Sequence, residues 1–362
     1  MSLKRFGWSS YFEACWQEHK ESVWIPGRVV SQQRGLWRVR GDFAECWVAP
    51  SGKVRAEAEE GRGVWPAVGD WVAVEISGGD ERGMLHAVLP RRSQFVRKVA
   101  GRRIEEQVIA ANVDLAFVMA GLGGDFNLRR LERYLSQCWE SGARPVLVLN
   151  KLDECGDPAT RLTEVERIGM GAPVFALSAL TGQGVEALKP CLVAGQTIVL
   201  LGSSGVGKST LLNRLLGQSV QTVQAVRERD ERGRHTTTSR ELFALPCGAL
   251  IIDTPGLREL QLWDAADGVV QTFADIEELA VRCRFRNCGH ASEPGCAVQA
   301  AVAAGELAPE RLENRKKLKR ELEFLRRKMD PQARQQEKQR TRVLHRSARQ
   351  IYDQRKRDGG KE

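Results

Sequence analysis

The sequence predicts a multidomain protein with an all-β domain first, an α/β domain in the centre and a mostly helical region last. Short strands separated by Gly and Pro fill residues 24–96, with turn signals such as Gly41-Asp42 between them. After residue 110, compact apolar runs alternate with helical stretches, and from residue 272 the chain contains clustered cysteines and then a charged tail. We therefore expect three domains, at residues 1–100, 101–271 and 272–362.

Composition excludes several classes of protein. Of the 362 residues, 42% are hydrophobic and 28% are charged, and no stretch reaches the ~18 consecutive apolar residues of a membrane span. Residues 1–20 contain Glu13 and Glu18 where a signal peptide would have an apolar core. Nine cysteines, an odd number, argue against a disulfide framework and for a reducing compartment. We expect a cytoplasmic protein with no membrane partner.

The net charge of +9 is concentrated in the tail. From Glu310 onward, 19 Lys and Arg residues accompany nine Asp and Glu, whereas the remaining 309 residues hold 36 basic and 37 acidic side chains. Such a segment is either a solvated helix or disordered end, or it binds a polyanion, with nucleic acid favoured over a membrane.

The first domain contains five strand-like segments with partial alternation of apolar and polar residues. This pattern predicts a small β-barrel or sandwich. Trp37 and Trp47 could face RNA there, although core packing is the more ordinary role of a tryptophan. The segments are residues 27–30, 36–40, 45–50, 70–76 and 84–89.

The central domain contains five apolar runs and a helical stretch at residues 128–141. Strands that alternate with helices indicate βαβ units and a mostly parallel sheet covered on both faces. The apolar runs are residues 113–119, 145–149, 174–177, 197–201 and 249–252.

A phosphate-binding loop follows the fourth of these runs. The segment matches G-x-x-x-x-G-K-[ST], with an apolar strand before it and helical leucine periodicity after it. Its glycines let backbone N–H groups face phosphate oxygens, Lys208 would bridge the β- and γ-phosphates, and Ser209 would ligate Mg²⁺. This pattern predicts a nucleoside triphosphate but does not name the base. The loop residues are Gly202, Ser203, Ser204, Gly205, Val206, Gly207, Lys208, Ser209 and Thr210.

Two segments indicate that the base is guanine. In Asn150-Lys151-Leu152-Asp153, the Asp153 carboxylate can accept hydrogen bonds from guanine N1–H and its 2-amino group, which adenine does not offer. The stem of Lys151 would cover the base, and Asn150 would tie this segment to the phosphate loop. Ser178 and Ala179 begin a second segment, whose small residues let a backbone N–H approach guanine O6.

The remaining elements of a GTPase follow the phosphate loop. Asp253 closes an apolar strand and would act on Mg²⁺ through water, and the N–H of Gly256 would contact the γ-phosphate. Between the phosphate loop and Asp253 lies a polar loop in which Thr237 is expected to complete the Mg²⁺ shell; a solvated connector is the alternative.

The order of these elements is unusual. In Ras-like GTPases the phosphate loop comes first and the base-reading segments come last, whereas here residues 150–153 and 178–179 precede residues 202–210. A circular permutation explains the order, because each βα unit can keep its place in the sheet while the chain ends move. The segment after Gly256 then leads directly into the C-terminal region, which could receive nucleotide-dependent movement.

A cysteine-histidine cluster lies beyond the GTPase elements. Three thiols and one imidazole within fourteen residues suit a tetrahedral Zn²⁺ with no open position for water, and reduced cysteines without metal are the alternative. The four candidate ligands are Cys283, Cys288, His290 and Cys296.

The ordered set of motifs resembles the ribosome small subunit-dependent GTPase A family over nearly the whole chain. NKLD, SALTG, GSSGVGKST, GRHTTT, DTPG and the Cys/His cluster occur in that order. The resemblance implies an N-terminal OB-fold, a permuted P-loop GTPase domain and a C-terminal zinc-binding domain. It also implies binding to the small ribosomal subunit and its rRNA, subunit-stimulated hydrolysis of GTP to GDP, and a role in late subunit maturation. We expect a monomer.

The sequence lacks the residue that usually positions the hydrolytic water. Leu257 stands where Ras-like enzymes have the glutamine that positions the attacking water, so we expect slow intrinsic hydrolysis. His235 is the candidate replacement, with a solvated histidine as the alternative. An RNA-binding scaffold with incidental hydrolysis and an ATP-using kinase remain alternative functions.

Two basic segments are candidate RNA contacts. Residues 91–93 and 97–98 follow the barrel, and residues 315–320 and 326–328 alternate with leucines in a pattern typical of an amphipathic helix.

Overall fold

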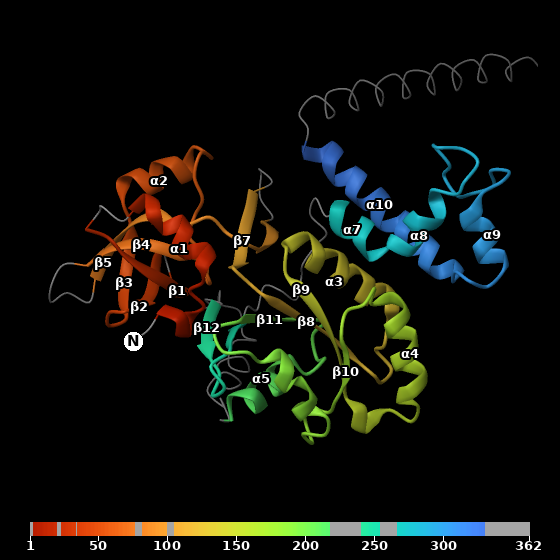
Figure 1. Ribbon diagram of the computed structural model, residues 1–362, viewed down its shortest axis with the longest axis horizontal. Helices are drawn as coiled ribbons and strands as arrows, with labels where there is room; N and C mark the ends of the chain where they lie inside the picture. Colours follow the sequence, from red (N-terminus) through yellow and green to blue (C-terminus); the bar gives the residue numbers. More distant parts are fainter. Residues whose placement is uncertain are drawn as a thin grey trace, which may run out of the picture.

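The computed structural model describes residues 3–19, 23–33, 35–76, 82–99, 105–217, 240–253 and 266–329. Its three parts follow the order that the sequence predicts: a β-barrel, a central α/β part and a C-terminal helical part (Figure 1). Among these residues, no helix combines the length and apolar character needed to cross a membrane.

The N-terminal barrel is closed, because β1 pairs with both β2 and β4. Its inward positions are apolar and fully buried, Val29, Val39 and Val48 among them. Trp37 is buried and donates its indole N–H to the Pro66 carbonyl, which confirms the core role for this residue. The elements are η1 Leu3–Phe6, α1 Ser10–Trp16, η2 Gln17–His19, β1 Ile25–Gln33, β2 Leu36–Gly41, β3 Cys46–Pro50, α2 Gly52–Glu59, β4 Trp71–Ile76 and β5 Arg82–Val88.

The central sheet has the strand order β10-β9-β8-β11-β13-β12, parallel except for β12. The expected parallel sheet is therefore present, and β11, which leads into the phosphate loop, lies in its middle. The strands are β8 Leu115–Gly121, β9 Arg144–Asn150, β10 Val174–Ala176, β11 Thr197–Leu201, β12 Arg240–Ala244 and β13 Leu250–Asp253.

Helices cover both faces of this sheet. One hydrophobic core joins the sheet to α3 and α4 and continues into the barrel, and a second joins the opposite face to α5 and η4. The helix expected at residues 128–141 is α3, which Asn127 caps at its N-terminus and Gly142 ends in a left-handed conformation. The helices are α3 Leu128–Ser141, η3 Leu152–Glu154, α4 Pro158–Ile168, η4 Val185–Cys191 and α5 Lys208–Leu216.

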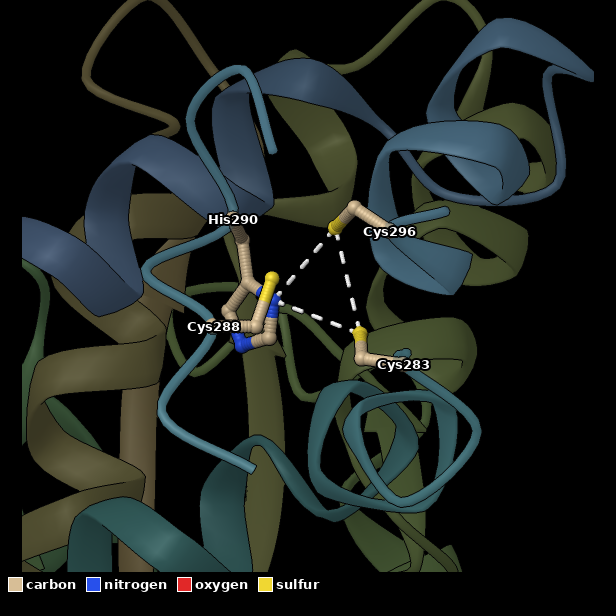
Figure 2. A group of neighbouring side chains, drawn as sticks. All are labelled: Cys283, Cys288, His290 and Cys296. Carbon is tan, nitrogen blue, oxygen red and sulfur yellow. Dashed lines mark hydrogen bonds between the residues drawn. The ribbon is translucent and has the colours of Figure 1, made fainter. Parts of the chain in front are cut away.

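The C-terminal part packs α7, α8, α9 and α10 around its own small core, next to the Cys/His cluster (Figures 1 and 2). Leu312, Leu318 and Leu322 of α10 are buried, so the predicted amphipathic helix belongs to the folded unit. The predicted RNA-contact surface included Arg315, but its side chain is only 10% exposed and pairs with Glu277 at 2.6 Å. Arg315 therefore contributes little to that surface. The helices are α7 Ala266–Thr272, α8 Ala274–Ala280, α9 Ala297–Ala303 and α10 Pro309–Met329.

The barrel and the central sheet are hydrogen-bonded into one continuous eleven-stranded sheet. β1 pairs antiparallel with β12, where Ser31 lies opposite Glu241 and Gln32 opposite Arg240. The antiparallel pair of β6 Gln94–Val99 and β7 Glu105–Ala111 also lies between the two parts, so the expected domain boundary at residue 100 falls between two strands that pair with each other.

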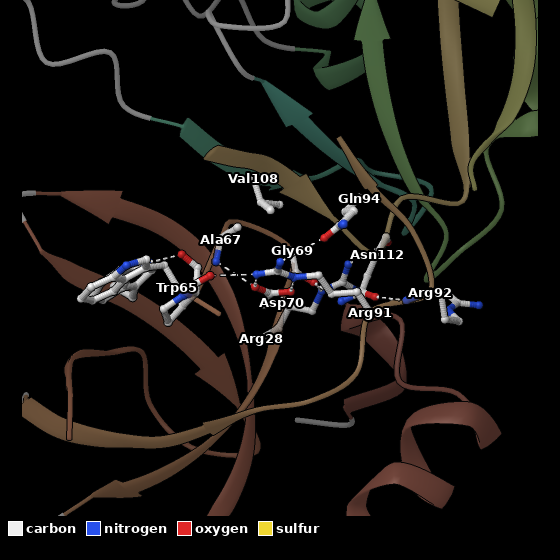
Figure 3. A network of polar contacts seen from close by, with 12 residues as sticks. Arg28, Trp65, Ala67, Gly69, Asp70, Arg91, Arg92, Gln94, Val108 and Asn112 are labelled. Atoms are coloured by element: carbon white, nitrogen blue, oxygen red, sulfur yellow. Dashed lines mark hydrogen bonds and ion pairs between the residues drawn. The ribbon is translucent and has the colours of Figure 1, made fainter. Parts of the chain in front are cut away.

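Two of the residues expected to contact RNA at the barrel exit, Arg91 and Arg92, form ion pairs at this junction (Figure 3). Arg91 is nearly buried and forms a bidentate pair with Asp70 at 2.7 and 2.8 Å. Arg92 pairs with Asp114 at 2.9 Å. Arg91 therefore has little surface left for RNA, whereas the Arg92 side chain is 35% exposed and stays a predicted contact.

Candidate functional site

The predicted nucleotide-binding segments leave the central sheet at one edge. Asn150, the last residue of β9, lies opposite Gly121 of β8, and Leu201, the last residue of β11, lies opposite Val118. β13 ends at Asp253 and runs parallel to β11. Ligands of open parallel sheets bind at this carboxyl edge, so the topology gathers the segments where a nucleotide site is expected.

The phosphate loop curls between β11 and the first turn of α5. Gly205 and Gly207 have φ angles of 76° and 98°, which favour glycine. A Cβ on Gly207 would lie only 2.1 Å from Asn150 Nδ2, so no other residue fits there without movement. The Lys208 ammonium folds back over the loop and donates to the carbonyls of Gly202 and Ser203 at 2.7 and 2.5 Å.

Asn150 links the three motifs. Its Nδ2 donates to the Val206 carbonyl in the phosphate loop at 2.8 Å, and its Oδ1 accepts from the Ala179 N–H at 2.8 Å. The side chain is buried, so each amide atom has a protein partner. The tie between NKLD and the phosphate loop that the sequence predicts is therefore present, and it extends to the Ser178-Ala179 segment.

The rest of the NKLD segment is a short 3₁₀ turn at the surface. Lys151 adopts a left-handed conformation with φ of 65°, and Leu152 donates its N–H to the Leu177 carbonyl at 3.1 Å. Asp153 is exposed, as a carboxylate that meets a base from solution must be. The Lys151 ammonium lies 3.5 Å from the Glu154 carboxylate.

Sequence reasoning missed Asp125 in this site. The loop after β8 brings its carboxylate to the phosphate loop, where it accepts from the Ser203 hydroxyl at 3.2 Å. Arg130 binds both Asp125 oxygens at 2.8 and 2.9 Å, and this hydrogen bond and charge lower the Asp125 pKa. The signal in the sequence was an acidic residue in a glycine-rich loop that follows a buried strand.

The remaining predicted nucleotide residues fall into two groups. Ser209 and Thr210 lie in the first turn of α5, and Asp253 is half-buried at the end of β13. His235, Thr237 and Gly256 lie outside the residues that the structure describes.

The four predicted metal ligands converge on one point (Figure 2). Their ligand atoms all lie within 4.8 Å of one another. His290 Nδ1 is 3.7 Å from Cys283 Sγ and 3.5 Å from Cys296 Sγ, and the two sulfur atoms are 3.9 Å apart. Zn–S bonds of about 2.3 Å and a Zn–N bond of about 2.05 Å at tetrahedral angles give S···S near 3.8 Å and S···N near 3.6 Å. The cluster could thus hold a metal ion, and its spacing fits tetrahedral zinc.

Neighbouring groups hold the ligand loop in shape. The Glu293 carboxylate accepts backbone N–H groups from Gly289, Ala291 and Ser292 at 2.7 to 3.1 Å, and these hydrogen bonds lower its pKa to about 2. Burial, reinforced by the charge of Arg315, lowers the pKa of His290. A neutral imidazole is the form that binds a metal.

Comparison with known proteins agrees with this architecture. Residues 88–263 match the family model described as RsgA GTPase. The chain is 44% identical over 358 residues to "Small ribosomal subunit biogenesis GTPase RsgA" of Opitutus terrae, covering 96% of this chain and 97% of that one. It is 47% identical over 305 residues to "Small ribosomal subunit biogenesis GTPase RsgA 2" of Lactiplantibacillus plantarum, covering 84% of this chain and 85% of the relative.

Solved structures share the fold. YjeQ from Thermotoga maritima aligns with a TM-score of 0.63 and 27% identity, covering 83% of this chain and 99% of YjeQ. YloQ, a circularly permuted GTPase, aligns with a TM-score of 0.61 at 24% identity, covering 84% of this chain and 97% of YloQ.

The fold and the family match define a P-loop GTPase in which the NKLD and Ser178-Ala179 segments precede the phosphate loop, that is, a circularly permuted GTP hydrolase. Its sequence similarity extends across the barrel, the central sheet and the C-terminal helices. The chain belongs to the RsgA GTPase family.

Proposed function

We propose that this GTPase binds the small ribosomal subunit as a monomer in the cytoplasm, contacts its rRNA and assists its late maturation. The subunit stimulates hydrolysis of GTP to GDP and phosphate. The observation that carries this function is the 44% identity over 96% of the chain to a small ribosomal subunit biogenesis GTPase, a match that includes both parts flanking the GTPase sheet.

In the proposed nucleotide site, the loop of residues 202–210 cradles the phosphates and Lys208 bridges the β- and γ-phosphates. Ser209 and Thr237 would hold Mg²⁺, with Asp253 acting through water, and the ion would supply positive charge next to the phosphates. Asp153 reads the guanine edge, Lys151 covers the base, and the segment that begins with Ser178 and Ala179 supplies an N–H to O6. The hydrogen bonds of Asn150 with Val206 and Ala179 support this assignment, because they hold the NKLD segment, the phosphate loop and the Ser178-Ala179 segment together.

The attacking water is positioned by His235 or by a group of the subunit, since Leu257 cannot hydrogen-bond to water. The Gly256 N–H contacts the γ-phosphate. If the subunit supplies or orders the group that positions the water, the free protein hydrolyses GTP slowly and the subunit-bound protein hydrolyses it faster.

The metal of the cluster is one structural Zn²⁺. Three thiolates and an imidazole complete a tetrahedral shell, so no position remains for a reactive water. The ion would hold the loop of Cys288 and His290 against α9, where Gln299 donates its backbone N–H to Cys296 Sγ at 3.4 Å and its side-chain amide to the His290 carbonyl at 2.6 Å.

A basic groove between α10 and the loop of residues 285–290, which contains Cys288 and His290, is the proposed rRNA contact in the described part of the chain. Its volume is about 620 Å³, and its lining includes Arg286, Lys316, Lys319 and Arg320. Phe285 also lines it and is 41% exposed, so an unpaired base could stack on the ring while the cations meet phosphates. Arg315, which pairs with Glu277, also lines the groove, as do the carboxylates of Glu313 and Glu323. Part of this surface is the predicted basic helix.

Co-sedimentation tests the partner. The protein should pellet with purified small subunits in the presence of a non-hydrolysable GTP analogue and much less with GDP, and purified large subunits serve as the control. Equal retention on both subunits at physiological salt would indicate general attraction to RNA and would contradict the proposal.

A further inference from the structure

Arg214 connects α5, the helix that follows the phosphate loop, to the loop of residues 178–182, which we call the base loop. It lies in the last turn of α5, the helix that begins with Lys208. Its Nε donates to the Ala179 carbonyl at 2.7 Å, and its Nη2 donates to the Leu180 carbonyl at 2.5 Å. A planar guanidinium is suited to this task, because its donors have a fixed relative geometry that a lysine lacks.

The base loop leaves room for this guanidinium. Gly182 has a φ of +92°, and a Cβ there would lie 2.6 Å from Arg214 Nη1. The loop is otherwise closed by its own bonds, from the Gly182 N–H to the Ser178 carbonyl at 2.8 Å and from the Thr181 N–H to Ser178 Oγ at 3.1 Å. The left-handed turn therefore favours glycine at this position, and the missing side chain leaves space for the guanidinium.

A hydrogen bond to a backbone carbonyl also fixes the direction of the N–H in the same peptide. In a trans peptide the C=O and the N–H lie in one plane and point in opposite directions. The Ala179 carbonyl shares its peptide with the Leu180 N–H, so Arg214 directs that N–H away from α5. The preceding N–H, that of Ala179, is already held by Asn150 Oδ1 at 2.8 Å. Asn150, which is bound to the phosphate loop, and Arg214, which belongs to α5, thus fix the orientations of the peptides that carry the Ala179 and Leu180 N–H groups.

We propose that Arg214 is a positioning residue for guanine recognition, which orients the backbone N–H of Leu180 toward O6 of the base. This inference rests on the proposed assignment of these residues as the base loop. Arg214 does not touch the nucleotide in this account; it acts only through the loop.

Base analogues separate this role from a general structural one. IDP keeps O6 and lacks the 2-amino group that Asp153 would read, whereas 6-thio-GDP keeps N1–H and the 2-amino group but presents a weaker, larger sulfur at position 6. Affinities of GDP, IDP and 6-thio-GDP would be measured by calorimetry on the full chain. Arg214→Ala should narrow the preference for GDP over 6-thio-GDP by about five-fold, the value of one net hydrogen bond, and leave the GDP-to-IDP ratio unchanged within about two-fold.

Two further variants sharpen the test. Arg214→Lys keeps the charge but not the paired donors, so it should lose most of the same preference. Lys189→Ala removes an exposed cation of η4 that pairs with Glu186 and should leave all three affinities unchanged.

Three results would contradict the inference. Equal weakening of all three nucleotides by Arg214→Ala would mean that Arg214 acts on the phosphates or on stability, and wild-type preferences in Arg214→Lys would exclude the two-carbonyl contact. If the wild-type protein itself does not prefer GDP to either analogue, the proposed base site is wrong, which is a failure of the function and not of Arg214 alone.

Discussion

Arg311 of α10 and Glu132 of α3 form a buried ion pair, with Nη1 and Oε1 2.5 Å apart and side-chain exposures of 8% and 3%. The same guanidinium binds Asp275 through Nε at 2.8 Å, and Asn314 donates to the other Glu132 oxygen at 2.5 Å. The pair joins the helix that follows β8 to the C-terminal helices. The part that contains the Cys/His cluster is therefore fixed to the GTPase sheet through α3.

Replacing Arg311 should destabilise the protein in a pH-dependent way. Arg311→Met leaves Glu132 buried without its cation, for which we expect a loss of about 3 kcal/mol in the free energy of unfolding at pH 7.5. Burial already raises the Glu132 pKa above its usual value, and loss of the cation would raise it further. The folded state then holds a proton that the unfolded state releases, so stability falls as pH rises above the unfolded pKa. Urea unfolding at pH 5 and pH 7.5 should show a smaller deficit at pH 5.

Arg320→Met is the matched control for this change, because Arg320 lies on the same helix but is exposed. It should alter stability by less than about 0.5 kcal/mol at either pH. A deficit of equal size at both pH values in Arg311→Met would show that Glu132 does not titrate as this account requires.

Arg28 should be essential for the attachment of the barrel. It is buried, and it donates to the carbonyls of Phe6, Gly69 and Asn112 and to the Thr197 hydroxyl at 2.5 to 3.2 Å. Arg28→Met removes every donor and should cost at least about 3 kcal/mol, since each buried acceptor left unpaired costs about 1–3 kcal/mol. Burial lowers the Arg28 pKa to about 10, so the residue stays charged between pH 6 and 9.

Urea unfolding of Arg28→Met checks this, and the loss should be the same across that pH range. Arg55→Met, an exposed arginine of α2, is the control and should have little effect. A stability close to wild type in Arg28→Met would mean that the strand pairing of β1 with β12 is sufficient to hold the barrel.

Removing one metal ligand should release the ion and loosen the C-terminal helices. Elemental analysis of the purified protein should find one zinc per chain, and Cys283→Ser should have none. Because such ions contribute roughly 10–16 kcal/mol of apparent free energy to folding, we expect the variant to lose the protease resistance of α8 to α10. Cys247→Ser, an exposed cysteine outside the cluster, is the matched control. Full protease resistance in metal-free Cys283→Ser would contradict a structural role.

Two C-terminal deletions of different length should affect subunit binding and folding differently. Removal of residues 330–362 takes away ten basic and five acidic side chains beyond the described helix, and it should weaken subunit binding and flatten its salt dependence while nucleotide affinity is kept. A cut before Pro309 also removes Leu312 and Arg311, so it should unfold the C-terminal part. Fluorescence titration with GDP and subunit binding at several salt concentrations would distinguish the two. Unchanged subunit binding in the shorter deletion would exclude residues 330–362 from the contact.

Local pattern and spacing were enough to predict the strand and helix that flank the candidate site but not the contacts between distant segments. The strand before the phosphate loop and helix α3 have the predicted bounds, because their apolar patterns are complete within a few residues. The pairing of β1 with β12 joins residues about 200 positions apart, and no local signal encodes it. Arg91 and Arg315 read as exposed cations because their partners, Asp70 and Glu277, become neighbours only after folding.

GTP turnover in the presence and absence of purified small subunits tests the central claim most directly. The wild-type protein should hydrolyse GTP slowly alone and faster with small subunits, while large subunits have no effect. Lys208→Ala should remove both rates, because it lacks the ammonium that the phosphate loop positions. Turnover that small subunits leave unchanged would contradict a GTPase that acts on the small subunit.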